Sequence, residues 1–250
     1  MPQKGILADC LYAEGKYQVA ADYYKEAFEC YKRHYRSDTG PESVELMGAL
    51  QLIAWVLLSK KDYDEATTAC ENALGITQRL LGPENVDVAS SMVNLATAYV
   101  NKGDIGSEPE ILLTKALNTY NKKSEDIIDK AQYSDEMKKL NFLIGSVQVS
   151  MGSLMYLRGK DDLALEHYNI VIKMFENGSY DYTEAVQALK NAALILWRRN
   201  QLADAEKLLA RALFKFETSE KYGTEHVRTK KLRLLLNNLR EGKDAPPMSN

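Results

Sequence analysis

Small residues recur at a fixed spacing along this sequence, and this spacing restricts its fold more than any other feature. Five of them, Ala8, Ala54, Ala96, Gly152 and Ala193, lie 12 or 13 residues ahead of a second set. That second set is Ala20, Ala66, Pro109, Ala164 and Ala205, and it is followed seven residues on by Ala27, Ala73, Ala116, Val171 and Ala212. Self-similarity at a fixed period is the signature of a stacked-repeat architecture. We therefore expect pairs of antiparallel helices whose backbones approach at these small side chains.

Each of the five units contains an apolar stripe at helical spacing, then a glycine or polar break, then a second stripe. In the second unit the break at Lys61 separates Ala54 from Ala66, Cys70 and Ala73. On these residues the chain resembles the tetratricopeptide repeat family over about residues 1–217. The resemblance implies an all-α, right-handed superhelical solenoid of about five helix pairs. We expect the units near residues 1–35, 44–81, 87–120, 140–176 and 183–217.

The period is longer than the 34 residues usual in this family. Ala54 and Ala96 are 42 residues apart, and Gly152 and Ala193 are 41 apart. The connector that begins Gly82-Pro83 resembles the loop between repeats of kinesin light chain and its relatives, although it lacks their common His-Pro pair. Glycine stops a helix, and proline fits the opening turn of the next one. The sequence therefore favours the long-repeat subclass of the family.

Repeats predict one continuous domain, because each unit contacts mainly its neighbours. We expect this domain to cover residues 1–241 and to end in a capping helix at 225–241, where Leu232, Leu235, Leu236 and Leu239 form a narrow apolar stripe. Basic residues interrupt the stripe; they predict a solvated face or, alternatively, a contact with an acidic partner or an anionic membrane. Residues 242–250, with two consecutive prolines, are typical of a disordered tail.

The spacing between reference residues widens once, to 56 residues between Ala96 and Gly152. The extra residues lie in the charged stretch 121–139. They predict either two lengthened neighbouring helices or a protruding hairpin that docks a partner, and we expect the first. Loops and insertions carry function more often than core positions do, which keeps the second alternative open.

Composition indicates an ordinary protein fold and excludes several partners. The formal net charge of −3 argues against general binding to nucleic acid, which requires neutralisation of phosphates. We expect no membrane span, because we identify no sufficiently long apolar run. Residues 1–30 have no signal-peptide layout, so we expect a cytoplasmic, soluble protein. Met1 lies close to the first repeat; the sequence is expected to be a fragment of a longer protein, unless a partner covers this end.

Residues with catalytic or metal-binding chemistry are scattered. The histidines His34, His167 and His226 lie in three different segments, without a His or Cys partner at metal-ligand spacing. The three cysteines are isolated and form no C-x-x-C pair. Phosphate loops and nucleophile motifs are missing from the sequence. We therefore expect no enzymatic activity, no metal and no cofactor.

Function is then expected on the concave surface, which in this family is lined mainly by the first helix of each pair. Asn94 and Asn191 match an asparagine whose amide grips the backbone of an extended peptide in long-repeat relatives. Trp55 and Trp197 fall outside the packing positions and are expected to be exposed anchors, with packing between neighbouring units as the alternative. The full set of predicted groove residues is Gln51, Trp55, Asn94, Thr97, Asn101, Ser150, Tyr156, Lys190, Asn191, Trp197 and Arg198.

The carboxylate clamp by which some members of this family bind chaperone tails is not expected. Its five positions need several cations, and the window that starts in the second unit holds Gln51, Trp55, Asn94, Ser146 and Ser150. The sequence therefore predicts a protein–protein interaction module, such as a scaffold, an adaptor or an assembly factor, that binds a peptide or helical segment in its groove. The alternative is a permanent structural subunit of a large assembly that uses its outer faces and ends.

Overall fold

The computed structural model describes residues 61–128, 135–176, 182–219 and 223–248, together with eight single positions before residue 61. Contacts divide the chain into two compact units, Met1–Tyr120 and Asn121–Asn250. All elements in the described ranges are α-helices, which confirms the all-α repeat class. The first predicted helix pair lies outside the described residues, apart from four single positions. The single domain predicted for residues 1–241 stays a prediction.

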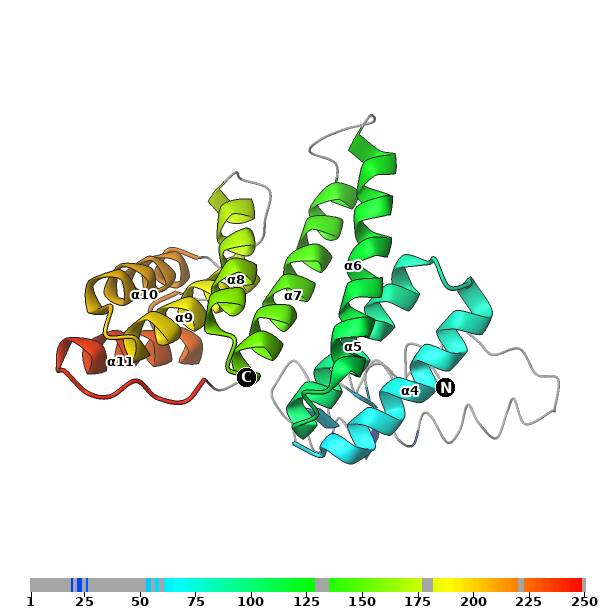
Figure 1. Ribbon diagram of the computed structural model, residues 1–250, viewed down its shortest axis with the longest axis horizontal. Helices are drawn as coiled ribbons and strands as arrows, with labels where there is room; N and C mark the ends of the chain where they lie inside the picture. Colours follow the sequence, from blue (N-terminus) through cyan, green and yellow to red (C-terminus); the bar gives the residue numbers. More distant parts are fainter. Residues whose placement is uncertain are drawn as a thin grey trace. The chain divides into compact units, whose positions relative to one another are not determined.

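In the first unit, helix α4 (Tyr63–Leu81) packs against helix α5 (Val86–Lys102), and helix α6 (Ser107–Ile128) begins after a short turn (Figure 1). Buried hydroxyl groups link these helices in addition to apolar contacts. Thr77 and Ser91 lie 3.2 Å apart between α4 and α5. Ser90 of α5 and Tyr120 of α6 lie 2.9 Å apart. Burial raises the pKa of the Tyr120 hydroxyl to about 12, and the hydrogen bond with Ser90 partly offsets this rise.

In its described residues the second unit contains the end of α6, from residue 121 on, and five whole helices: α7 (Asp135–Leu157), α8 (Asp161–Glu176), α9 (Tyr182–Arg198), α10 (Leu202–Glu217) and α11 (Val227–Arg240) (Figure 1). Consecutive helices pack against each other from α7 to α11. Helix α7 also contacts α9 directly. Contact between the first helices of successive pairs is what stacking of repeats requires, so this unit has the predicted repeat organisation.

The small residues of the repeat are buried wherever the structure describes them. Ala54, Ala96 and Ala193 of the first set have no exposed area, and the same holds for Ala66, Ala164 and Ala205 of the second. Gly152 and Pro109 are also buried. The register predicted from the sequence is therefore confirmed over these residues.

The turn inside each helix pair has the same geometry four times. One residue adopts a left-handed conformation in each turn, namely Lys61, Gly103, Gly159 and Asn200. The amide of the following residue donates to a carbonyl five positions back, as from Asp104 to Tyr99 at 2.9 Å and from Gln201 to Leu196 at 2.9 Å. This is the hydrogen bond of a Schellman cap, which satisfies carbonyls at the end of the first helix. The predicted break in each unit is thus one recurring turn.

The connector between α4 and α5 confirms one part of its prediction and corrects another. Gly82 ends α4 with a φ of 78°, as expected for a helix stop. Pro83 does not open the next helix, because α5 begins only at Val86. The cap is Asn85, whose side chain accepts a hydrogen bond from the amide of Asp87 at 2.8 Å.

The widened spacing corresponds to two lengthened helices, although residues 129–134 between them lie outside the described ranges. Helix α6 has 22 residues and α7 has 23, against 16 in α8 and 17 in α9. Their adjoining ends pack together: Ile127 and Met137 are buried, and Lys123 lies 3.7 Å from Glu136. This arrangement agrees with the lengthened-helix alternative.

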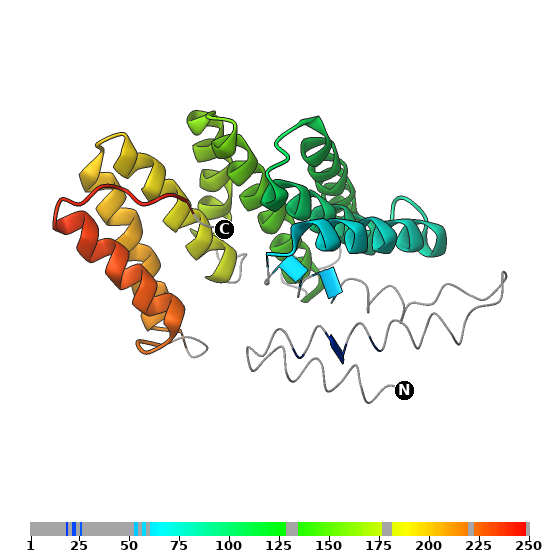
Figure 2. The ribbon, with the colours of Figure 1, turned by 90° about the horizontal axis from the view of Figure 1, so that it is seen from below.

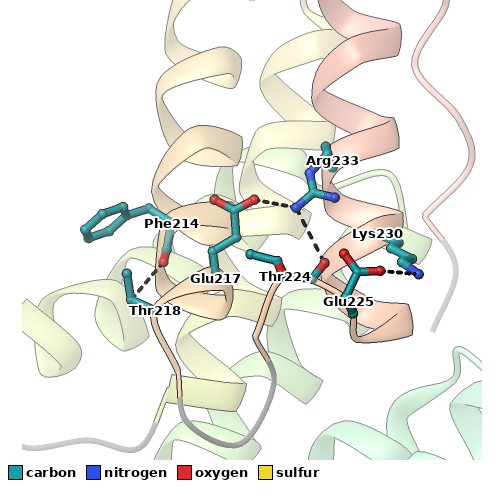
Figure 3. Close-up of polar contacts among 7 residues, drawn as sticks. All are labelled: Phe214, Glu217, Thr218, Thr224, Glu225, Lys230 and Arg233. Atoms are coloured by element: carbon teal, nitrogen blue, oxygen red, sulfur yellow. Dashed lines mark hydrogen bonds and ion pairs between the residues drawn. The ribbon is translucent and has the colours of Figure 1, made fainter.

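Helix α11 covers the apolar face of α10, as the leucine stripe predicts. Leu232, Leu236 and Leu239 are buried, and α11 packs on α10. Two ion pairs hold the turn before it (Figure 3). Arg233 contacts Glu217 at 2.7 Å, and Lys230 contacts Glu225 at 2.9 Å. The basic residues are therefore partly engaged within the fold.

Helix α7 corrects the expectation that no segment is long and apolar enough to cross a membrane. It has 23 residues and contains an 18-residue window with a mean hydropathy of 1.3. Half of that window is buried inside the protein, where α7 contacts α8 and α9. Core packing accounts for the apolar composition, so the helix is weak support for a membrane span.

Candidate functional site: the α7–α9 face and residues 243–248

The predicted groove residues fall into three groups. Gln51 and Trp55 lie outside the described residues. Asn94, Thr97 and Asn101 lie on α5 in the first unit. The remaining residues lie on α7 or α9 of the second unit, two helices that contact each other; they are Ser150, Tyr156, Lys190, Asn191, Trp197 and Arg198.

The α5 residues occupy one side of the helix at spacings of three and four. All three are half-buried. Thr97 donates its hydroxyl hydrogen to the carbonyl of Val93 at 2.8 Å, so the hydrogen bond of this hydroxyl is made within the helix. This stripe has the half-exposed character that the groove prediction requires.

Asn191 is not an exposed groove residue. Only 1% of it is exposed, and its amide nitrogen donates to the hydroxyl of Tyr168 at 3.2 Å. Its amide oxygen accepts from Gln187 at 3.1 Å. Both ends of the amide are therefore engaged inside the fold, which differs from the expectation that Asn191 faces a peptide.

Tyr168 of α8 is the centre of this polar cluster, a role that the sequence analysis missed. It is fully buried, and its hydroxyl lies 3.2 Å from Ser153 of α7. Burial raises the pKa of this hydroxyl, and the hydrogen bonds with Ser153 and Asn191 partly offset the rise. The ring fits only because residue 152 is glycine: a Cβ there would lie 2.6 Å from Tyr168 Cε1.

A second polar pair lies next to this cluster. Gln148 of α7 is 7% exposed, and its side-chain oxygen accepts from Nδ1 of His167 at 2.7 Å. His167 of α8 thus has a partner on α7. The contact between α7 and α8 therefore contains hydrogen bonds as well as apolar packing.

Trp197 corrects the expectation of an exposed anchor. It is 5% exposed, and its indole N–H donates to the carbonyl of Lys243 at 3.1 Å. Next to it, Arg198 donates to the carbonyl of Pro246 at 3.0 Å and lies over the ring of Tyr156, 5.1 Å from its centroid. Two adjacent residues of α9 thus bind the backbone of the segment that follows α11.

This segment, residues 243–248, corrects the prediction of a disordered tail over the range described. Figure 2 shows it as the red extended segment that runs back from the end of α11. Its far end reaches the polar cluster, where the hydroxyl of Tyr168 donates to the sulfur of Met248 at 3.6 Å. The physical reason for its order is that Pro246 and Pro247 stiffen the chain, so that less conformational entropy is lost when a few contacts hold it.

A cavity of about 380 Å³ remains beside the segment. Its lining combines the end of α9 with the end of α11 and includes Trp197, Arg198, Leu239, Lys243 and Ala245. The space therefore lies next to the two residues that bind the segment backbone.

Lys190 of α9 lies close to the cations of α11. Burial and the nearby charges of Arg228 and Lys231 lower the pKa of Lys190 to about 8. Its charged form is therefore disfavoured at this position. The prediction that Lys190 faces a partner gains no support from this environment.

Chemistry for catalysis is sparse in the part of the chain that the structure describes. Within it, no group of three or more His, Cys, Asp or Glu side chains could hold a metal ion. Cys70 is buried, and burial together with the nearby charge of Glu71 raises the pKa of its thiol to about 12, which makes it a poor nucleophile. The arrangement offers hydrogen-bond donors and apolar contacts to a polypeptide.

The fold defines the class of protein: paired antiparallel helices, closed by one recurring turn and stacked on neighbouring pairs, make a helical-repeat protein. Residues 45–107 match the family model of the tetratricopeptide repeat. The tetratricopeptide repeat is therefore present over this part of the chain, as the sequence resemblance predicts. A search of curated proteins found no match.

Solved structures share this fold at low sequence identity. BtubC (BKLC) from P. vanneervenii is 21% identical with a TM-score of 0.61, covering 100% of this chain and 84% of that one. The nearly identical TPR-like repeats assigned to a kinesin light chain of Podospora anserina are 15% identical, with a TM-score of 0.60 and coverage of 88% and 96%. Aspartyl phosphate phosphatase F from Bacillus subtilis is 15% identical, with a TM-score of 0.51 and coverage of 99% and 62%. These likenesses show the helical-repeat fold and assign no activity.

Proposed function

We propose that this chain is a non-enzymatic interaction module, an adaptor or assembly factor, that holds an extended segment of a partner protein on its α7–α9 face. One observation carries the proposal. Trp197 and Arg198 each donate a hydrogen bond to a backbone carbonyl of an extended segment, at 3.1 and 3.0 Å. Donors that bind main-chain carbonyls recognise a polypeptide regardless of most of its side chains.

The surroundings of these donors support the same function. Arg198 is exposed at the surface and stacks on Tyr156, so its guanidinium is held in place by the cation–π contact. Trp197 supplies a large apolar surface with one polar hydrogen, a combination enriched in binding hot spots. The half-exposed stripe Asn94, Thr97 and Asn101 on α5 is a second candidate surface in the first unit.

The test is a selection of peptide ligands from a random 12-residue library. It uses the intact chain and a variant in which residues 243–248 are replaced by a Gly/Ser segment of equal length. Selected peptides are synthesised, and their affinities are measured by fluorescence anisotropy. We expect Arg198→Ala to weaken binding about tenfold, because a hydrogen bond from a charged donor contributes about 1.5 kcal/mol or more.

The matched control is Arg211→Ala on α10, another surface arginine, which pairs with Glu176 at 2.6 Å. It should leave peptide affinity unchanged. Selection of no peptide on either chain, or equal losses from Arg198→Ala and Arg211→Ala, would contradict the proposal. A chain that aggregates unless a partner is co-expressed would instead favour a permanent structural subunit.

A further inference from the structure

We propose that residues Lys243–Met248 are a built-in ligand of the α7–α9 face, and that partner segments of the same chemistry bind by displacing them. This inference rests on the proposed function and adds its regulation and its ligand class. The contacts join residues far apart in the sequence: Trp197 with Lys243, Arg198 with Pro246, and Tyr168 with Met248.

The spacing of these contacts matches one backbone conformation. The two carbonyls bound by adjacent residues of α9 belong to Lys243 and Pro246, which are three residues apart. A polyproline II helix has three residues per turn, so that carbonyls three apart point the same way. Its unbonded carbonyls remain available to external donors such as Trp197 and Arg198.

Exposure differs between residues of the segment. Lys243, Asp244 and Pro247 are exposed, whereas Ala245, Pro246 and Met248 are half-buried. One side of the segment therefore meets the protein and the other meets solvent. A ligand of this class needs a proline-containing extended backbone. It also needs two apolar residues, two and five positions after the residue with the first bound carbonyl, where the segment has Ala245 and Met248.

The start of the segment is fixed to the end of α11. The amide of Gly242 donates to Leu239 at 3.1 Å, and the amide of Lys243 donates to Asn238 at 3.0 Å. A short tether of this kind gives the segment an effective concentration of about 1 mM at the face. The rest of the segment is held by few polar contacts, so a partner of modest affinity is able to replace it.

The experiment uses a fluorescent peptide with the sequence of residues 241–250, added to the intact chain and to the chain with the Gly/Ser replacement of residues 243–248. We expect the intact chain to bind the peptide about tenfold more weakly, because an effective concentration of about 1 mM competes with a peptide whose Kd is about 0.1 mM. In the replaced chain, Arg198→Ala should weaken binding about tenfold.

Matched point variants make the same test in an otherwise complete chain. Met248→Ser removes a half-buried side chain that contacts Tyr168, and it should raise peptide affinity toward that of the replaced chain. Asp244→Ser changes an exposed side chain and should leave peptide affinity as in the intact chain. Circular dichroism checks that each variant keeps its helices.

Three results would overturn the inference. The first is that the peptide binds neither chain, in which case the segment only covers Trp197. The second is that it binds both chains equally. The third is that its binding does not depend on Arg198. Library-selected peptides that depend on Arg198 but bind both chains equally would leave the proposed function standing and refute only the displacement. Failure of every peptide on both chains would refute the proposed function itself.

Discussion

Asn94 in the first unit and Asn191 in the second occupy the same position of the repeat, yet their surroundings differ. Asn94 is half-buried on α5. Asn191 is 1% exposed and bonded to Tyr168 and Gln187. The same residue type at the same repeat position is therefore half-exposed in one unit and completes an internal network in the other.

The difference follows from the preceding second helix. The residue four after the small reference residue is Cys70 in α4 and Tyr168 in α8. Cys70 is a small buried thiol, whereas Tyr168 brings a ring and a hydroxyl. The reference residue beside the ring is Gly152, where the unit of α4 has Ala54, and the missing methyl group leaves room for the ring. Tyr168 thus makes the Asn191 amide part of an internal network.

Gly152→Ala should have the largest effect on this comparison. The added methyl group would lie 2.6 Å from the fully buried ring of Tyr168, which has no room to move. We expect a loss of about 1–3 kcal/mol in the free energy of unfolding, measured by urea denaturation. The matched control is Gly75→Ala in α4, where a Cβ meets Arg79 at an ordinary 3.5 Å. It should stabilise the chain by about 0.5–1 kcal/mol, and a similar gain at position 152 would refute the packing argument.

Asn191→Ala and Asn94→Ala test the two asparagines directly. Removing the Asn191 amide leaves Gln187 and Tyr168 with one partner fewer in a buried site, so we expect a loss of about 1–2 kcal/mol in the free energy of unfolding. Asn94→Ala should change it by less than about 0.5 kcal/mol, as for most partly exposed positions. Equal urea midpoints for the two variants would show that the network contributes nothing.

Lys190→Gln tests the charge environment next to Asn191. The folded-state pKa of Lys190 is lowered from 10.5 to about 8, so between these values the unfolded chain binds more protons and the contribution of Lys190 to stability rises with pH. Below pH 8 the charged group destabilises the fold. The stability advantage of the variant over the parent should therefore shrink by about 1–2 kcal/mol between pH 7.5 and pH 10.

The tyrosines and Cys70 titrate in both the Lys190→Gln variant and its parent. Their contributions to the pH dependence of the free energy of unfolding therefore cancel when the two chains are compared. As a control, Lys231→Gln removes one of the two neighbouring charges and should reduce the slope of stability with pH. A pH-independent difference between Lys190→Gln and the parent would mean that Lys190 is solvated.

Lys61→Gly should have the smallest effect. Lys61 has a φ of 64°, a conformation that glycine adopts at no steric cost. We expect a gain of about 0.5 kcal/mol, because the relief of this strain exceeds the added entropy of the unfolded chain. Asn200→Gly at the equivalent turn in the second unit should gain less, because asparagine tolerates this conformation. Equal melting temperatures for Lys61→Gly and the parent would contradict this.

The sequence predicts the features that depend on local periodicity. The helix pairs, the burial of residues such as Ala96 and Ala193, and the leucine stripe of α11 all follow from spacings along one or two helices. The contact between Trp197 and Lys243 joins residues 46 positions apart, and no periodic signal links them. One signal was readable, since Gly152 replaces the usual alanine in the unit that contains Tyr168. A glycine at this position indicates that a larger side chain, here the ring of Tyr168, packs against it.

The four equivalent turns have a consequence for how such a chain can grow. Each turn closes with the same hydrogen bond, so the end of the first helix is capped in the same way each time. Duplication of an entire pair would reproduce its own boundaries and leave its neighbours correctly joined. An insertion of a few residues within a turn would instead remove the hydrogen bond that caps the first helix. Genetic variation in length should therefore accumulate between pairs, or as whole pairs.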